Sequence, residues 1–203
     1  MELLNKRAYP KVCFEILEEL SEQLPDFLTY HSIDHSIDVA NVCNNYIEFY
    51  KIEKSLAKLI RIAAVSHDYG YLFSPKDHEE RSIVEITPRL EKNLSQKEIR
   101  FIAGMIRATK VPQNPQNFYQ EIVADADLDY LGREDYNKWS ERLYKEFQYF
   151  GVVKTHLEWL DVQIKFLENH HYHTDLAKEN RCGPKKRKLQ GLIRLKKLSD
   201  SSV

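Results

Sequence analysis

The sequence has few of the residues that interrupt regular secondary structure. Its 203 residues include only six glycines and seven prolines, and most of these lie between long segments with helical periodicity. Because glycine and proline mark turns and breaks, their scarcity leaves long stretches uninterrupted. The sequence therefore predicts an all-α fold.

Cysteine is also scarce, and long apolar runs are missing. The three cysteines, Cys13, Cys43 and Cys182, are odd in number and widely spaced. The first two lie in apolar helical patterns, which predicts buried, reduced thiols of a cytosolic protein. No apolar run approaches the ~20 residues needed to cross a bilayer. The N-terminus, with Glu2 and Lys6, has no secretory core. We therefore predict a cytoplasmic protein that has no membrane partner.

An excess of charge of one sign is absent as well. The 30 basic and 31 acidic residues give a formal net charge of -1, so no overall field favours nucleic acid. We therefore expect no nucleic-acid polymer as a partner, and we interpret the basic run 185–188 as a solvated helix start. We predict one domain over 1–203, with a motif-bearing core at about 25–135 and C-terminal helices at about 134–203 packing on it. The sequence leaves the oligomeric state open.

Apolar residues recur with helical spacing along most of the chain. Ser95-Gln96-Lys97-Glu98 forms a capping box at one of the expected helix starts. The helices are expected at about 11–24, 32–50, 54–68, from 77 onward, 95–109, 118–132, 134–150 and 153–169, with a last amphipathic stretch ending near 198.

The segment Ala63–Tyr71 places an imidazole beside a carboxylate at the end of an apolar run. The run predicts a buried helix, and Gly70 is expected to end it as a C-terminal glycine. An imidazole nitrogen and a carboxylate oxygen, here from His67 and Asp68, together suit a divalent metal. The dipeptide is common by chance, and the alternative is a histidine that caps its own helix.

Two further groups of candidate ligands lie before and after this segment. His31 and His35 are four residues apart, so on one helix they lie on the same face, either as a ligand pair or as an acid beside a ligand. Asp125 lies in an apolar run, where a carboxylate is costly unless it is paired or ligating. Asp127 follows it by two residues, about 200° around a helix, so the two cannot easily ligate together.

The order of these motifs, a histidine, then His-Asp, then an aspartate, resembles the HD superfamily of metal-dependent phosphohydrolases. The resemblance is carried by His35, His67, Asp68 and either Asp125 or Asp127. It implies that these residues hold one divalent metal inside an all-α HD-domain bundle. Asp125 is preferred because apolar residues precede the family's aspartate, and Asp127 is the alternative.

Two more segments resemble particular branches of this superfamily. His31–Val39 is similar to the His-xxx-His-xx-Asp-Val signature of the cyclic-nucleotide phosphodiesterase branch, in which the first histidine donates a proton and the second binds metal. Asp77–Ser82 is similar to the His-Glu-xx-Ser element of small bacterial HD phosphohydrolases. The two-metal branch has further histidines where this chain has Arg107, Thr109 and Lys110, so we expect a single metal.

The resemblance implies hydrolysis of a phosphate ester of a nucleotide or a related small molecule. His31, as general acid, and Asp68 are the expected catalytic residues. The metal would be manganese, magnesium, iron, cobalt, nickel or zinc, with open positions for water and a phosphate oxygen. The alternative is a catalytically silent HD module that binds a nucleotide or a protein partner and keeps a structural metal. The expected substrate-binding residues are His78, Glu79, Arg81, Arg107 and Lys110.

Overall fold

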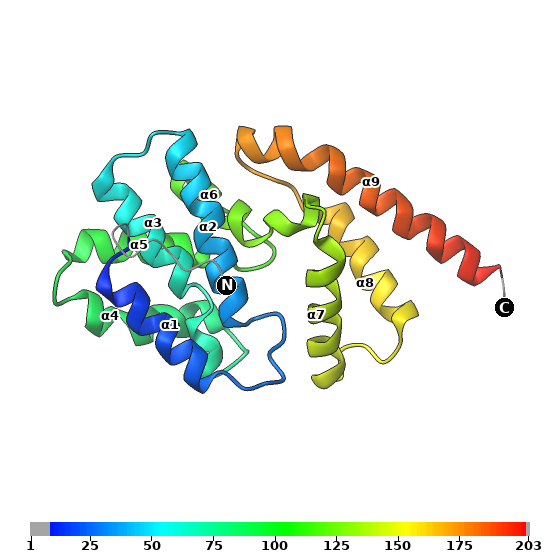
Figure 1. Ribbon diagram of the computed structural model, residues 1–203, viewed down its shortest axis with the longest axis horizontal. Coiled ribbons are helices and arrows are strands. Elements are labelled where there is room, and N and C mark those ends of the chain that lie inside the picture. The colour runs from blue at the N-terminus through cyan, green and yellow to red at the C-terminus, as the bar shows by residue number, and fades with distance from the viewer. Residues whose placement is uncertain (1–8, 202–203) are drawn as a thin grey trace. The chain divides into compact units, whose positions relative to one another are not determined.

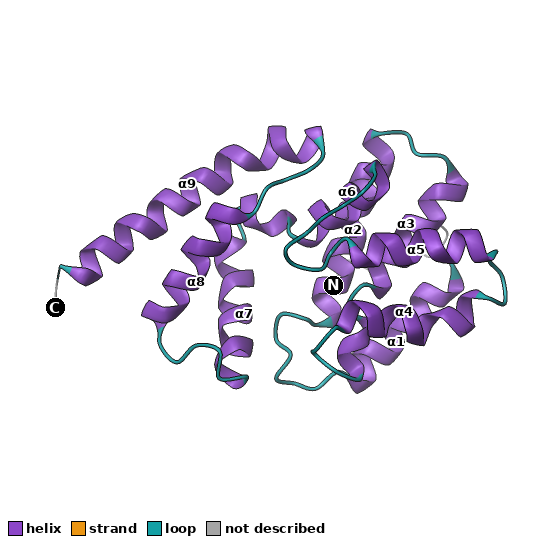
Figure 2. Cartoon of the chain, turned by 180° about the vertical axis from the view of Figure 1, so that it is seen from behind, coloured by secondary structure: helices purple, strands orange, loops and turns teal. Residues whose placement is uncertain are grey.

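All secondary structure in the described part of the chain is helical. The structure is a computed structural model that describes residues 9–201, and no strand occurs within that range (Figure 1 and Figure 2). The prediction of an all-α fold is therefore confirmed. Two short 3₁₀ helices, η1 (Tyr69–Leu72) and η2 (Asp129–Gly132), lie among the α-helices. The α-helices are α1 (Lys11–Gln23), α2 (Ile33–Phe49), α3 (Lys54–Ser66), α4 (His78–Leu90), α5 (Gln96–Arg107), α6 (Phe118–Asp127), α7 (Tyr136–Tyr149), α8 (His156–Asn169) and α9 (Asp175–Asp200).

The chain divides into two compact units, and the division falls between Asp127 and Leu128. The N-terminal unit contains α1 to α6 and η1, whereas the C-terminal unit contains η2 and α7 to α9. The helix expected to continue to Gly132 ends at Asp127, because Leu128 leaves the helical region with φ -108° and ψ 18°. The division therefore lies a few residues before the expected start of the C-terminal helices. A single domain over 1–203 stays a prediction.

Helix α3 is the centre of the N-terminal unit. It packs against α1, α2, α5 and α6, and its residues from Leu59 to Ser66 are buried except for Arg61. Removing each large aliphatic side chain from water contributes about 1.5–3 kcal/mol, so this apolar run stabilises α3 inside the unit. The prediction of a buried helix that leads into His67 is confirmed. Because α2 and α6 also pack against each other, the end of α3 lies where three helices meet.

The predicted capping box at the start of α5 is confirmed. The hydroxyl of Ser95 accepts a hydrogen bond from the backbone N–H of Glu98, and the Glu98 carboxylate accepts one from the backbone N–H of Ser95 at 2.8 Å. Thr155 and Glu158 form the same arrangement at the start of α8. In both cases two backbone donors that the helix itself leaves unpaired acquire acceptors.

The C-terminal unit is built around contacts of α8 with α9 and of η2 with α7 and α9. Tyr144, Val153 and Trp159 form a buried apolar cluster. Helix α9 is continuous over 26 residues and appears in Figure 1 as the long helix coloured orange to red. The basic run 185–188 therefore lies in the middle of α9, and the expectation that it starts a helix is wrong.

Two further expectations concern the cysteines and the membrane. Cys13 and Cys43 are buried and form no disulfide within residues 9–201, as predicted. Burial raises the pKa of the Cys13 thiol to about 12, although the nearby Arg61 acts in the opposite direction. Among the helices of this described range, none combines the length and the apolar character that crossing a bilayer requires.

Candidate metal centre

Three potential metal ligands converge from three helices of the N-terminal unit. His35 lies in the first turns of α2, His67 directly follows α3, and Asp127 is the last residue of α6. Nε2 of His35 lies 3.0 Å from Oδ1 of Asp127 and 3.3 Å from Nε2 of His67. Nε2 of His67 lies 3.5 Å from the same Asp127 oxygen. Each residue offers one ligand atom, and all three atoms lie within 4.8 Å of one another.

Asp68 adds a second carboxylate to this group. Its Oδ2 atom lies 3.1 Å from Nε2 of His67 and 3.5 Å from Nε2 of His35. That oxygen is buried and accepts no hydrogen bond from any described residue. A buried carboxylate oxygen without a donor is costly unless a cation compensates it. The four residues thus present two imidazole nitrogens and two carboxylate oxygens, a donor set that suits a divalent metal.

The tautomer of His67 supports the same interpretation. Nδ1 of His67 lies 2.8 Å from the backbone carbonyl of Ala64. A carbonyl oxygen only accepts, so Nδ1 carries the proton, and in the neutral ring the lone pair of Nε2 is directed toward Asp68 and Asp127. A lone pair and two carboxylates cannot share a buried space without a positive charge among them. Metal-binding histidines commonly have this partner on the other ring nitrogen.

The pKa shifts within the group also indicate that it requires a positive charge. Burial favours neutral His67, but the charges of Asp68 and Asp127 outweigh it and raise the pKa of the imidazole well above its ordinary value. Burial likewise opposes ionisation of Asp127, but hydrogen bonds with His35 and His67 lower its pKa to about 2. Burial also opposes ionisation of Asp68, but the charge of His67 holds its pKa well below its ordinary value. Both carboxylates are therefore anionic, and either a proton or a metal must balance them.

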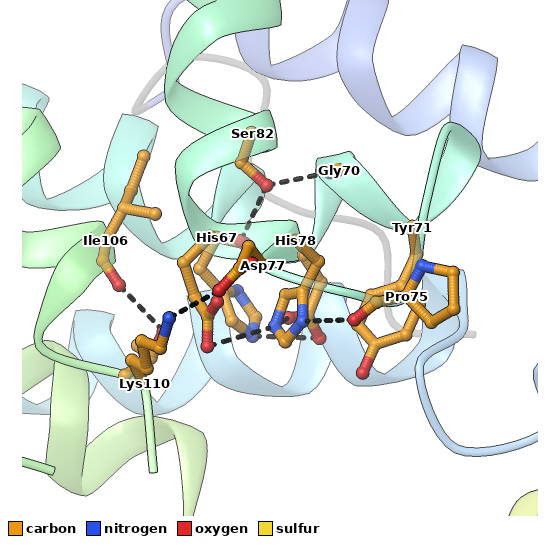
Figure 3. Close-up of polar contacts among 12 residues, drawn as sticks. His67, Gly70, Tyr71, Pro75, Asp77, His78, Ser82, Ile106 and Lys110 are labelled. Atoms are coloured by element: carbon orange, nitrogen blue, oxygen red, sulfur yellow. Dashed lines mark hydrogen bonds and ion pairs between the residues drawn. The ribbon is translucent and has the colours of Figure 1, made fainter. Parts of the chain in front are cut away.

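The position of His67 and Asp68 is fixed by contacts between α4 and the turn that follows α3. The Ser82 hydroxyl donates to the carbonyl of His67 at 2.8 Å and accepts from the N–H of Gly70 at 2.7 Å, as Figure 3 shows. Ser82 is completely buried. One hydroxyl thus satisfies two backbone groups on either side of Asp68 and holds the turn against α4.

The role expected for Gly70 is wrong. Helix α3 ends at Ser66, and Gly70 lies within η1 with no left-handed φ. A Cβ atom on Gly70 would lie 2.0 Å from the carbonyl oxygen of His78. Glycine is therefore required for the close approach of η1 to the first turn of α4, and this approach brings His78 to the site.

The preference for Asp125 over Asp127 is corrected by the structure. Asp127 reaches the two histidines, whereas Asp125 is completely buried in α6 and is not part of this group. Successive α-helical residues are rotated by about 100°, so only one of two residues spaced by two can face α2 and the end of α3. The next acidic residue, Asp129, belongs to the C-terminal unit and is bound by Arg181 at 2.8 Å.

His31 lies beside the ligand group and contacts a tyrosine. Nε2 of His31 lies 3.0 Å from the hydroxyl of Tyr71, and the two rings stack with centroids 4.1 Å apart. The centroid of the His31 ring is 6.3 Å from that of His35. Sequence reasoning missed Tyr71, because an aromatic residue in a short turn matches none of the motifs.

The structure brings His78 and Glu79 to the other side of Asp68. Nε2 of His78 lies 3.2 Å from Oδ1 of Asp68 and 3.5 Å from Oε1 of Glu79, which is buried. The His78 ring also packs on Tyr71 with centroids 4.2 Å apart. Burial opposes protonation of His78, but the hydrogen bond and charge of Asp68 raise its pKa. Two of the five expected substrate-binding residues, His78 and Glu79, thus border the candidate metal centre.

The other three expected substrate-binding residues, which would bind phosphate as cations, do not contact the candidate metal centre. Each forms an ion pair with a carboxylate, and none contacts the four candidate ligands in the described residues. Lys110 contacts Asp77 at 2.7 Å, next to His78 (Figure 3). Their carboxylate partners already neutralise these side chains, and all three pairs are partly exposed. The pairs are Arg81–Glu85, Arg107–Glu80 and Lys110–Asp77.

Comparison of the chain with protein-family models, with curated proteins and with solved structures finds no match.

Proposed function

We propose that this protein is a metal-dependent phosphohydrolase of the HD superfamily. The observation that carries the proposal is the buried convergence of His35, His67, Asp68 and Asp127, with Nε2 of His67 directed at two carboxylates. This is the ligand order that the sequence motifs imply, with Asp127 in the last position. A bound divalent metal would lower the pKa of a coordinated water and offset the charge of a phosphate.

His31 is proposed as the general acid that protonates the leaving oxygen. It stands next to the ligand group without joining it, and its Nε2 atom exchanges a hydrogen bond with the Tyr71 hydroxyl. The Tyr71 ring stacks on His31 and packs at a tilt against His78, which restrains the orientation of both imidazoles. A proton donor held in this way accelerates hydrolysis by about 10²–10⁴-fold.

The proposed substrate is a phosphate ester of a nucleotide or a related small molecule. His78 and Glu79 border Asp68, so they are placed to contact a phosphate or its water shell. Lys110 is half-exposed and pairs with Asp77, which precedes His78. If Lys110 released Asp77 and bound a phosphate instead, it would add a positive charge beside His78. Arg81 and Arg107 would need to leave Glu85 and Glu80 in the same way.

A screen for phosphate release tests this function directly. Nucleotides and nitrophenyl phosphate esters would be incubated with the protein and manganese, magnesium or cobalt. We expect activity that chelation abolishes, and a His31→Ala variant that keeps its metal but loses about 10²–10⁴-fold in turnover on nucleotides. The loss should be smaller on nitrophenyl esters, since they need little protonation. Loss of metal in His31→Ala would indicate that His31 is a metal ligand. Full activity of this variant would indicate that His31 has no catalytic role.

One observation favours the alternative of a catalytically silent HD module. All three expected phosphate-binding cations form ion pairs with carboxylates. Such a module would bind a nucleotide or a protein partner and keep the metal as a structural element. A protein that holds one metal per chain yet releases no phosphate from any nucleotide, under any of the three metals, would support this alternative over the enzyme.

A further inference from the structure

Helix α9 carries a concentration of positive charge that the near-zero net charge of the whole chain does not reveal. Residues 182–199 contain seven lysines and arginines and no aspartate or glutamate, in a chain whose formal net charge is -1. All of these residues belong to one continuous helix. The seven residues are Lys185, Lys186, Arg187, Lys188, Arg194, Lys196 and Lys197.

Three of the seven cations have structural partners within the C-terminal unit. Lys185 donates to the carbonyls of Leu167 and His170, the former at 3.1 Å, and so caps the end of α8. Lys188 donates to the side-chain oxygen of Asn137 at 3.0 Å. Lys196 pairs with Asp161 of α8. These three side chains therefore serve the packing of the unit.

The other four cations form a surface that we call the α9 basic stripe, composed of Lys186, Arg187, Arg194 and Lys197. All four are exposed, and none has an ion-pair partner among residues 9–201. At about 100° per residue they occupy an arc of about 100° on one side of the helix. Arg194 and Lys197 are three positions apart, where like charges repel. No ion pair of the stripe with the described residues therefore stabilises the unit.

We propose that the α9 basic stripe binds the phosphate backbone of duplex DNA without sequence preference. The stripe consists of two pairs, Lys186 with Arg187 and Arg194 with Lys197, whose mean positions are nine residues apart. A rise of 1.5 Å per residue separates the pairs by about 13 Å, close to the ~12 Å width of the major groove. The phosphate backbones of the two strands border that groove. If α9 lies across the groove, one pair of cations therefore contacts each backbone.

Other polyanions fit the stripe less well. Single-stranded nucleic acid is bound largely through stacking on aromatic side chains, and α9 contains no aromatic residue. A helix that lies in a membrane surface needs a broad apolar face. The only strongly exposed large apolar side chains of α9 are Leu195 and Leu198, near its end. Backbone contacts alone support only weak binding, with a Kd of about 10⁻⁴–10⁻⁶ M.

Fluorescence anisotropy of a labelled, mixed-sequence DNA duplex of about 20 bp tests the proposal with the full-length protein. Four phosphate contacts predict a slope of about -3.6 for log affinity against log salt, or about 10²-fold weaker binding between about 50 and 200 mM salt. The variant K186Q/R187Q/R194Q/K197Q should lose most of the affinity and most of the salt dependence. Far-UV circular dichroism should show that its helices are retained, since all four side chains are exposed.

A matched control separates the stripe from net charge. The variant K145Q/K154Q/K165Q/K178Q removes four exposed lysines of the same unit and changes the charge equally. It should lose far less duplex affinity than the stripe variant. Equal losses in the two variants would overturn the proposal, as would tighter binding to the single strand than to the duplex. Absence of duplex binding at low salt, or binding only to phosphatidylserine vesicles, would overturn it as well. The outcome is independent of the proposed phosphohydrolase activity.

Discussion

At the residue scale, the two carboxylate oxygens of Asp68 contact different residues. Oδ2 lies against His35 and His67, whereas Oδ1 lies 3.2 Å from His78. The side chain is buried, so these contacts are made at low local dielectric and count for more than they would in water. Asp68 therefore links the candidate metal ligands to His78, a proposed substrate-binding residue. Through this carboxylate, the charge on His78 and the binding of a metal at the ligands depend on each other.

The assignment of Asp127 as a ligand can be tested against its neighbour. Asp127→Asn replaces an anionic oxygen of the ligand group by a neutral amide, so we expect metal affinity to fall by orders of magnitude. Asp125→Asn changes the same chemistry two residues away, outside the group, and should keep one metal per chain. Elemental analysis of folded protein after dialysis gives the metal content. The opposite pattern would return the assignment to Asp125.

At the scale of elements, the turn after α3 is held by side-chain hydrogen bonds from α4 and α1. Ser82 of α4 bonds to His67 and Gly70, and Glu19 of α1 bonds to both Tyr69 of η1 and Arg89 of α4. The ligand positions thus depend on how α1 and α4 are packed and not on α3 alone.

Loss of the Ser82 hydroxyl should weaken metal binding without removing a ligand. Ser82→Ala leaves a buried carbonyl and a buried N–H without the Ser82 hydroxyl, which costs about 1–3 kcal/mol for each group left unsatisfied. Loss of such supporting hydrogen bonds typically reduces metal affinity by about 10–100-fold. Ser66→Ala is the matched control, because Ser66 is equally buried but, within residues 9–201, its hydroxyl bonds only to Ile62 of its own helix. If both variants bind metal equally, Ser82 has no positioning role.

The Glu19–Arg89 pair should make stability depend on acidic pH. Arg89 donates two hydrogen bonds to Glu19, at 2.7 and 2.8 Å, and they lower the pKa of that carboxyl despite partial burial. A carboxyl with a lowered pKa in the folded state stabilises the protein above its unfolded pKa of about 4.3, and the gain disappears as pH falls through the lower, folded pKa. The pair is partly exposed, so we expect about 1 kcal/mol.

Urea unfolding of Glu19→Gln against the unchanged protein measures this contribution. The variant should be less stable by about 1 kcal/mol at neutral pH and nearly equal at about pH 2. Glu15→Gln, which removes an exposed pair with Lys11, should have a smaller effect at either pH. A difference for Glu19→Gln that grows toward acid would have the wrong sign for a lowered pKa and would exclude this explanation.

At the scale of the whole molecule, chemistry and charge are distributed unevenly between the two units. The candidate metal ligands all belong to the N-terminal unit, and the α9 basic stripe belongs to the C-terminal unit. The near-neutral net charge is the sum of a helix rich in cations and of acidic residues elsewhere. A property averaged over the chain therefore describes neither unit.

Metal should stabilise the folded protein in proportion to its occupancy. A ligand that binds only the folded state adds about 2.7 kcal/mol at a free concentration one hundred times its Kd. We therefore expect thermal unfolding, followed by far-UV circular dichroism, to shift upward with added manganese or cobalt and to shift back with a chelator. Asp127→Asn should show almost no shift. An equal shift in that variant would place the metal elsewhere in the protein.

The sequence by itself determined the helices and most of the candidate ligands. Apolar periodicity is local, so it identified the buried helix before His67, and the capping signal at Ser95 depends on residues only three positions apart. Both features depend on short segments, and tertiary contacts did not override them. His31 and His35, in contrast, do not share a helix, because α2 begins at Ile33, two residues after His31.

Only the tertiary structure decided which residues meet. The choice between Asp127 and Asp125 depends on the rotation of α6 against α2 and α3, which no local pattern encodes. The contact of Tyr71 with His31 joins residues 40 positions apart, and the three cations among the expected substrate-binding residues proved to have carboxylate partners. Along α9, the same packing divides seven similar cations into three with structural partners and four that face solvent, because only one side of a helix can contact its neighbours.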